Sequence, residues 1–222
     1  MEEPGDQWDQ AVASALKLAN TTATASRLGM AKLPATIRGT APPIALGETV
    51  RIPRSPARID EALRAKIRGA INGELPWPLF VHGPAGTGKT CAALCVLDFA
   101  GGSYFTTAGL CSIVVQAQQG RLEWTHEGRG GTIWPEKLLA RISGLPFVIL
   151  DEIGGRDRVS DHHYEAVKTL LDVRQGKPLM VLSNLGLSEI EKVYDDRIAS
   201  RLATGTIVRV DAKDRRLHKQ GD

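Results

Sequence analysis

The segment from Gly83 to Thr90 combines glycines, a lysine and a hydroxyl residue at a spacing that suits phosphate binding. It reads Gly83-Pro84-Ala85-Gly86-Thr87-Gly88-Lys89-Thr90, which is the pattern G-x-x-x-x-G-K-T. Glycines let backbone N–H groups turn inward around phosphate oxygens, and a helix that follows presents its N-terminus to the anion. We therefore expect Lys89 to contact the β and γ phosphates of ATP and Thr90 to ligate Mg²⁺.

An apolar run that begins at Pro146 ends in two carboxylates, Asp151 and Glu152. At the end of a buried strand, one carboxylate can hold Mg²⁺ and its neighbour can orient and deprotonate an attacking water. We expect Asp151 to take the first role and Glu152 the second. Solvated charge is common at strand ends, so this pair would be weak evidence alone. Together with the phosphate loop it indicates ATP hydrolysis.

Two further polar positions fit the same chemistry. Asn184 ends another apolar run, where its amide could reach the γ-phosphate side of the site, although it could also simply start the turn toward Gly186. Arg197 and Arg201 are four residues apart, which places them on one face of a short helix. A permanently cationic guanidinium suits the stabilisation of charge on a transferring phosphoryl group. The alternative for the two arginines is an ordinary charged surface helix.

The elements that would position these residues alternate between apolar runs and helical patterns. Five strands are predicted, at Leu79–His82, Ser103–Thr107, Pro146–Asp151, Pro178–Ser183 and Gly205–Val210. Helical patterns occupy the segments near 88–100, 108–119, 133–143, 161–175 and 195–203. The alternation predicts an α/β fold, with a five-stranded, mostly parallel sheet covered by helices on both faces.

Three regions follow one another along the chain. Residues 1–47 are rich in Ala, Thr, Gly and Pro and read as an extension and linker, with one short helix, Trp8–Ala19, that could bind a partner through its apolar side. Residues 48–76 contain an amphipathic helix over Ala57–Ile71 that leads into the core. Residues 77–222 form the predicted catalytic domain.

Composition limits the function classes only broadly. A chain of 222 residues with 42% hydrophobic and 24% charged residues is typical of one folded domain, and a formal net charge of +3 does not by itself indicate nucleic-acid binding. No apolar run is long enough to span a membrane, so a cytoplasmic protein is expected. Cys91, Cys95 and Cys111 lack the spacing of a zinc site, and Cys91 and Cys95, four residues apart in an apolar helical pattern, are predicted to be small core residues.

Residues 77–216 resemble the AAA+ helicase loaders of the bacterial DnaC kind and the related IstB transposition ATPases. The resemblance rests on GPAGTGKT, on FVILDEIG followed by HHYEAVKTLLDVRQGKP, on VLSNL and on DDRIASRL. It implies a P-loop NTPase of the AAA+ type that binds ATP and Mg²⁺ and forms a homo-oligomer on ATP binding. It further implies that Asn184 is sensor 1, that Arg201 is the trans-acting finger with Arg197 beside it, and that Arg215 or Arg216 is a possible sensor 2. The implied partners are a hexameric replicative helicase and single-stranded DNA.

Several functions share these motifs. A transposition helper would differ from a helicase loader only in its partner, and a nucleotide-dependent DNA-binding switch would not need Glu152. A small-molecule kinase would leave Asn184 and Arg201 without a clear purpose. The N-terminus is short and cysteine-free, unlike the helicase-gripping regions of many loaders. The Gly-rich segment Gly120–Thr132 reads either as a flexible loop or as a loop in which Trp124 stacks on a base.

Overall fold

A computed structural model describes residue 47 and residues 59–126, 129–155 and 159–211. The predicted helix Trp8–Ala19 and the two candidate sensor 2 residues, Arg215 and Arg216, lie outside these ranges.

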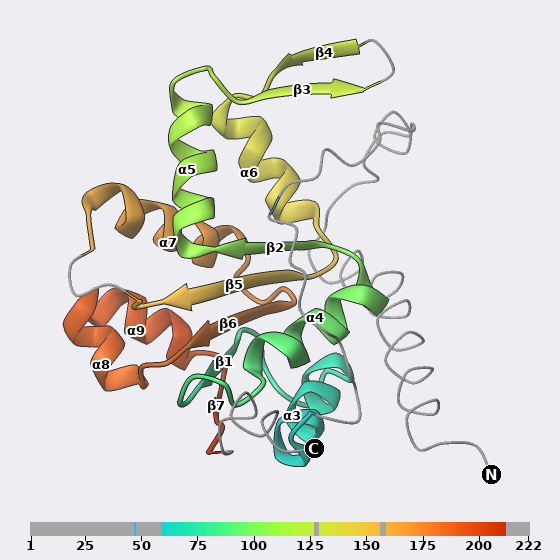
Figure 1. The fold of residues 1–222 in the computed structure, drawn as a ribbon, viewed down its shortest axis with the longest axis vertical. Helices are drawn as coiled ribbons and strands as arrows, with labels where there is room; N and C mark the ends of the chain where they lie inside the picture. The colour runs from blue at the N-terminus through green and yellow to red at the C-terminus, as the bar shows by residue number, and fades with distance from the viewer. Residues whose placement is uncertain (1–46, 48–58, 127–128, 156–158, 212–222) are drawn as a thin grey trace, which may run out of the picture.

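A five-stranded parallel sheet forms the centre of the molecule, with the strands in the order β2-β5-β6-β1-β7 (Figure 1). Its strands are β1 (Leu79–His82), β2 (Ser103–Thr106), β5 (Val148–Ile153), β6 (Leu179–Ser183) and β7 (Thr206–Arg209). Each corresponds to one strand that the sequence predicts, with small differences at the ends, so the predicted α/β class is confirmed. The long β5 continues past Asp151, which the apolar run alone does not indicate.

Helices connect these strands and cover the sheet. They are α3 (Glu61–Ile71), α4 (Lys89–Ala100), α5 (Thr107–Gln118), α6 (Pro135–Gly144), α7 (Asp161–Val173), α8 (Leu187–Val193) and α9 (Asp196–Ala203). The sequence prediction missed α8. The helix predicted over Ala57–Ile71 was also begun too early, because Asp60 is the N-cap of α3 and accepts a hydrogen bond of 3.1 Å from Leu63 N.

The two faces of the sheet are covered by different helices. Alternate residues of β1 illustrate the division, because Leu79 and Val81 pack in the cluster with α3 and α4 whereas Phe80 packs with α5 to α9. All three side chains have no exposed surface. A strand buried on both faces reads as a continuous apolar run, which explains why these strands are visible in the sequence.

A two-stranded antiparallel hairpin, β3 (Glu123–His126) and β4 (Arg129–Thr132), projects from the α5–α6 end of the molecule (Figure 1). The sequence prediction of a loop over Gly120–Thr132 is therefore wrong. Glycines at 130 and 131 lower strand propensity, but their partners Thr125 and Trp124 favour strands. Backbone pairing also begins before the hairpin, since Ile133 N donates a 2.7 Å hydrogen bond to Leu122 O.

The buried Arg174 fixes the end of α7 against the sheet. Its guanidinium donates to the carbonyl oxygens of Ile142, Ser143, Leu145 and Pro178, and only 1% of the residue is exposed. Burial lowers the pKa of Arg174 to about 10, so the group remains charged at neutral pH. Because these carbonyls belong to the end of α6 and to the turns leading into β5 and β6, Arg174 makes the end of α7 a rigid part of the core.

Candidate nucleotide-binding site

The phosphate loop connects β1 to α4 and depends on its glycines. Gly83, Gly86 and Gly88 have φ angles of 147°, 78° and 93°, which side-chain-bearing residues rarely adopt. A Cβ at Gly83 would also lie 2.1 Å from Val210 O, so no other residue fits there. The loop ends where Lys89 begins α4, so that the first turn of this helix, with Lys89, Thr90 and Cys91, borders the phosphate pocket.

Lys89 is buried at the centre of this loop. Its Nζ donates to Gly83 O at 2.7 Å, to Pro84 O at 2.8 Å and to Asn184 Oδ1 at 3.0 Å. The last contact joins the phosphate loop to the end of β6, across 95 residues of sequence. The structure therefore brings Asn184 to Lys89, so its side chain contacts the phosphate loop in addition to preceding the turn toward Gly186.

Thr90 and Asp151 form the oxygen-rich side of the site. Thr90 Oγ1 donates to Asp151 Oδ2 at 2.7 Å, and Tyr104 Oη donates to the same oxygen at 3.0 Å. Asp151 is only 7% exposed. A hydroxyl and a carboxylate at this separation fit Mg²⁺, which prefers oxygen ligands and usually binds through one or two protein groups beside substrate phosphates. Sequence reasoning missed Tyr104, because nothing along the chain links residue 104 to residue 151.

Glu152 occupies a strained position beside Asp151. Its φ of 62° is positive, and no other non-glycine residue in the described ranges has a positive φ. The strain coincides with a register irregularity between Leu150 and Ile153 in the pairing of β5 with β6, while Asp151 Oδ1 accepts a 2.7 Å bond from Glu152 N. An irregular strand can aim a side chain away from simple alternation, and here Glu152 borders the phosphate pocket with its side chain exposed.

We expect Glu152→Gly to raise stability while it removes ATP turnover. Glycine accepts a positive φ without steric cost, so the free energy of unfolding should rise by about 0.5–1 kcal/mol over that of Glu152→Gln, which retains the strain. Both variants should lose turnover, because neither can deprotonate water. Urea unfolding of the two proteins measures the difference. Equal or lower stability of the glycine variant would show that the positive φ at this position does not lower the free energy of unfolding.

Three hollows meet at the carboxyl edge of the sheet. The pocket around the phosphate loop has a volume of about 300 Å³ and is bordered by Lys89, Thr90, Asp151, Glu152 and Asn184 among others. A hollow of about 420 Å³ shares Glu152 and Asn184 with it, and a wider groove of about 910 Å³ shares Asn184. The smallest of the three contains the phosphate loop with Lys89, whereas the widest groove is lined by four carboxylates, Glu189, Glu191, Asp196 and Asp211, so we place the phosphates in the smallest.

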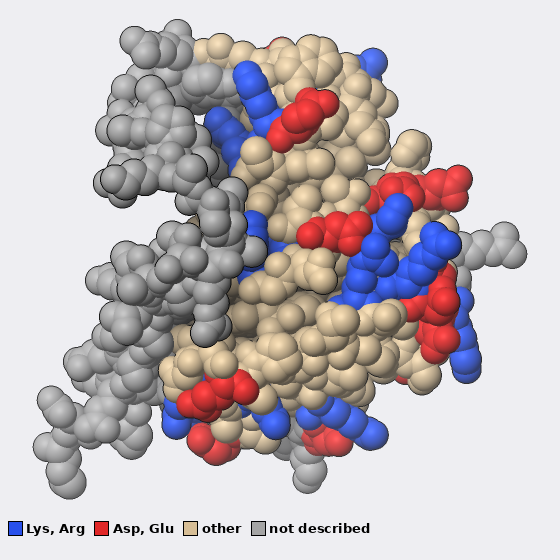
Figure 2. Space-filling model, turned by 180° about the vertical axis from the view of Figure 1, so that it is seen from behind, with Lys and Arg blue, Asp and Glu red and all other residues tan. Residues whose placement is uncertain are grey.

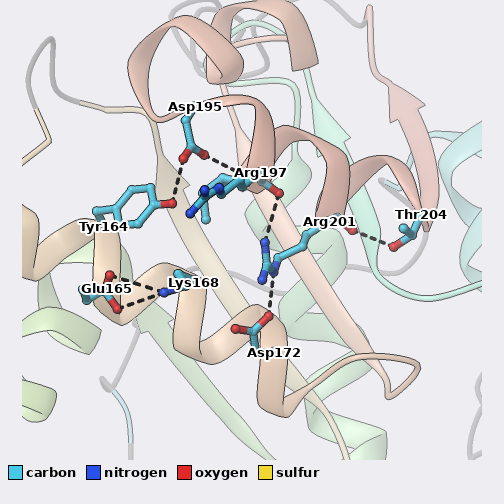
Figure 3. A network of polar contacts seen from close by, with 9 residues as sticks. Tyr164, Glu165, Lys168, Asp172, Asp195, Arg197, Arg201 and Thr204 are labelled. Atoms are coloured by element: carbon cyan, nitrogen blue, oxygen red, sulfur yellow. Dashed lines mark hydrogen bonds and ion pairs between the residues drawn. The ribbon is translucent and has the colours of Figure 1, made fainter.

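The two arginines lie apart from this pocket. Arg197 and Arg201 are on α9 and face α7, and neither borders the pocket around Lys89 (Figure 3). Arg201 Nε lies 2.6 Å from Asp172 Oδ1, and its Nη1 donates a long bond of 3.4 Å to Arg197 O. Within one copy of the chain, these arginines are therefore not positioned at the phosphates.

The cysteines do not gather with other metal ligands. Cys95 and Cys111 are buried, whereas Cys91 is half-buried and borders the phosphate pocket. In the described ranges, no group of three or more His, Cys, Asp or Glu residues is arranged to hold a metal ion. The helices of those ranges also include none that is long and apolar enough to cross a membrane.

The strand order and the phosphate loop define an AAA+ P-loop fold, and comparison with solved structures agrees. The chain is similar to AMPPCP-bound DnaA from Aquifex aeolicus, with a TM-score of 0.54 and 17% identity over 70% of this chain and 48% of that chain. It is also similar to DnaI, with a TM-score of 0.54 and 18% identity over 74% of this chain and 97% of that chain. A third neighbour is domain III of the Thermotoga maritima replication initiation protein DnaA, with a TM-score of 0.51 and 19% identity over 73% and 70%.

These likenesses show the AAA+ fold. The chain spans about half the length of the Aquifex DnaA chain that it matches. No protein-family model matches the sequence, and no curated protein matches it.

Proposed function

We propose that this chain is an ATPase that loads a replicative DNA helicase, acting as an oligomer that binds ATP, Mg²⁺ and single-stranded DNA. One observation carries the proposal. Lys89, Thr90, Asp151, Glu152 and Asn184 converge at one edge of the sheet, whereas the side chains of Arg197 and Arg201 face α7 and do not border that pocket. Such a site needs its arginine from a second copy. The similarity to DnaI, a loader of the DnaC kind, extends over 97% of that chain and supports the loading role.

Within one copy, different residues bind the phosphates, hold Mg²⁺ and activate the attacking water. The phosphate loop and Lys89 bind the β and γ phosphates, and Thr90 and Asp151 provide the oxygens that hold Mg²⁺. When bound, Mg²⁺ neutralises charge on the phosphate oxygens. Glu152 accepts a proton from the attacking water, and Asn184 exchanges its contact with Lys89 for one with the γ-phosphate.

The second copy completes the site. Arg201 of one subunit approaches the γ-phosphate held by its neighbour and stabilises the charge that spreads over the phosphoryl oxygens. Hydrolysis therefore depends on assembly, which would tie ATP turnover to the state of the loader on DNA. Residues 1–47 are the proposed helicase-binding extension, and the protein is expected in the cytoplasm.

An IstB-like transposition helper is the alternative, because it would use the same ATPase residues with a transposase as partner. A DNA-binding switch without turnover is less well supported, since the strained Glu152 borders the phosphate pocket. The arrangement of the ATP site does not favour one partner over the other, so the partner itself must be identified.

Affinity capture from the native host tests the proposal. The full chain, with ATP and Mg²⁺, is expected to recover a hexameric replicative helicase, identified by mass spectrometry, and a Lys89→Ala chain should recover much less. Lys66→Ala, which changes an exposed lysine of α3, is the matched control. Recovery of a transposase in place of a helicase would contradict the loading role and leave the ATPase assignment standing.

A further inference from the structure

Two contacts tie α9 to α7 (Figure 3), and none of the four residues that make them borders the pocket around Lys89. Tyr164 Oη donates a hydrogen bond of 2.7 Å to Asp195 Oδ2, and Arg201 Nε lies 2.6 Å from Asp172 Oδ1. Tyr164 and Asp172 are about 12 Å apart along α7 at the rise of an α-helix. The contacts therefore hold α9 near both of its ends.

The first contact fixes where α9 begins. Asp195 is the N-cap of this eight-residue helix, and its other oxygen accepts a 2.9 Å bond from Ile198 N. So short a helix has little stability of its own, which makes its direction depend on contacts of this kind. The bond to Asp195 raises the pKa of Tyr164, whose hydroxyl is already protonated at physiological pH and therefore acts as the donor.

The second contact orients Arg201 through Nε and not through the terminal nitrogens Nη1 and Nη2, which form the outer edge of the guanidinium. Asp172 binds Nε, from the side of the guanidinium, and among the described residues Nη1 makes one long contact, of 3.4 Å, with Arg197 O. Phosphate oxygens are usually bound by the terminal nitrogens of the guanidinium fork. The outer edge of Arg201 therefore remains suited to a phosphate while Asp172 holds the plane of the group.

The end of α7 is a firm support for this contact. Asp172 lies two residues before Arg174, whose guanidinium is buried and donates to four backbone carbonyls of the core. Asp172 itself is exposed at the surface, where Figure 2 shows acidic and basic side chains side by side on the edge formed by α7 and α9. A second copy can reach this edge.

We infer that Asp172 and Tyr164 are positioning residues that hold Arg201 in the orientation it needs at the ATP site of a second copy. The inference rests on the proposed function, because it concerns an arginine that acts in trans. A long, unrestrained arginine loses rotamer freedom when it is fixed on a phosphate, and a side chain already held on its own subunit loses less. Asp172 restrains the guanidinium, and Tyr164 restrains the helix that carries it.

Steady-state ATPase assays of the full chain, assembled on single-stranded DNA, test this inference. We expect Asp172→Asn to lower kcat about tenfold, with KM for ATP changed less than about twofold, because the ATP pocket of each copy is intact. Tyr164→Phe should lower kcat by a smaller factor, and Asp172→Glu should recover most of the kcat lost in Asp172→Asn. Glu165→Gln is the matched control, because it removes an acidic group from α7 whose partner is Lys168 and not α9. Its kcat should not change.

Combining variants separates this inference from the proposed function. If Asp172 acts through Arg201, the double variant Asp172→Asn/Arg201→Ala should turn over ATP no more slowly than Arg201→Ala alone. A normal kcat in Asp172→Asn, with turnover lost in Arg201→Ala, would overturn the positioning role and leave the trans-acting arginine in place. A fall in kcat together with Tm in Asp172→Asn, without recovery in Asp172→Glu, would also overturn it. Normal turnover in Arg201→Ala would instead contradict the proposed function.

Discussion

Replacing Lys89 with alanine is expected to weaken ATP binding by at least about 100-fold, which corresponds to about 3 kcal/mol. A charge-assisted hydrogen bond to a phosphate in a buried pocket is about twice as strong as a neutral one, and Lys89 is only 7% exposed. Its ammonium is already held 2.7 Å and 2.8 Å from two carbonyls of the loop, so little ordering is needed when the phosphates bind. Isothermal titration with a non-hydrolysable ATP analogue measures the loss.

The same substitution has a second consequence in the free protein. Without the ammonium, Gly83 O, Pro84 O and Asn184 Oδ1 lose a shared donor, and some stability should be lost as well. Lys89→Arg is the matched variant, because it retains the charge but is too long and too flat for the contacts of the loop. It should also bind ATP weakly. ATP affinity near that of the wild type in either variant would remove Lys89 from the phosphate site.

The sheet and the phosphate loop were predictable because their signals are local. Each central strand is buried on both faces, so a run such as Phe147 to Leu150 stands out without any knowledge of its neighbours. Parallel strands also share one carboxyl edge, so polar residues that follow separate strands can meet there. Lys89 and Asn184 do meet, at 3.0 Å.

Other features depend on contacts between distant segments. The helix Leu187–Val193 has seven residues, too few to show a helical period, and only Ile190 is buried in it. Tyr104 reaches Asp151 from the neighbouring strand, and Asp172 reaches Arg201 from another helix. An exposed aspartate on a helix is ordinary in sequence, so Asp172 gave no signal. The positive φ of Glu152 likewise arises from the pairing of β5 with β6, not from the residue type.

Replacing Arg201 with alanine is expected to lower kcat for ATP about 1,000-fold while the affinity for ATP changes little. Arg201 does not border the pocket around Lys89, so ground-state binding in the same copy does not involve it. Its loss would raise the energy of the transition state only, because negative charge then develops on the phosphoryl oxygens of the ATP that a neighbouring copy binds. Titration with the ATP analogue and steady-state assays on DNA separate the two quantities. Lys192→Ala, an exposed lysine of α8, should match the wild type in both.

Mixing two inactive variants shows whether the arginine acts between copies. Glu152→Gln binds ATP without turning it over and retains Arg201, and Arg201→Ala retains the whole site but lacks the finger. In an equal mixture that assembles at random, half of the subunits have an intact site and half of those adjoin a subunit that provides Arg201. About one quarter of wild-type turnover should therefore return. An arginine acting within its own subunit would give no recovery at any ratio, because no single chain in the mixture would then contain both groups.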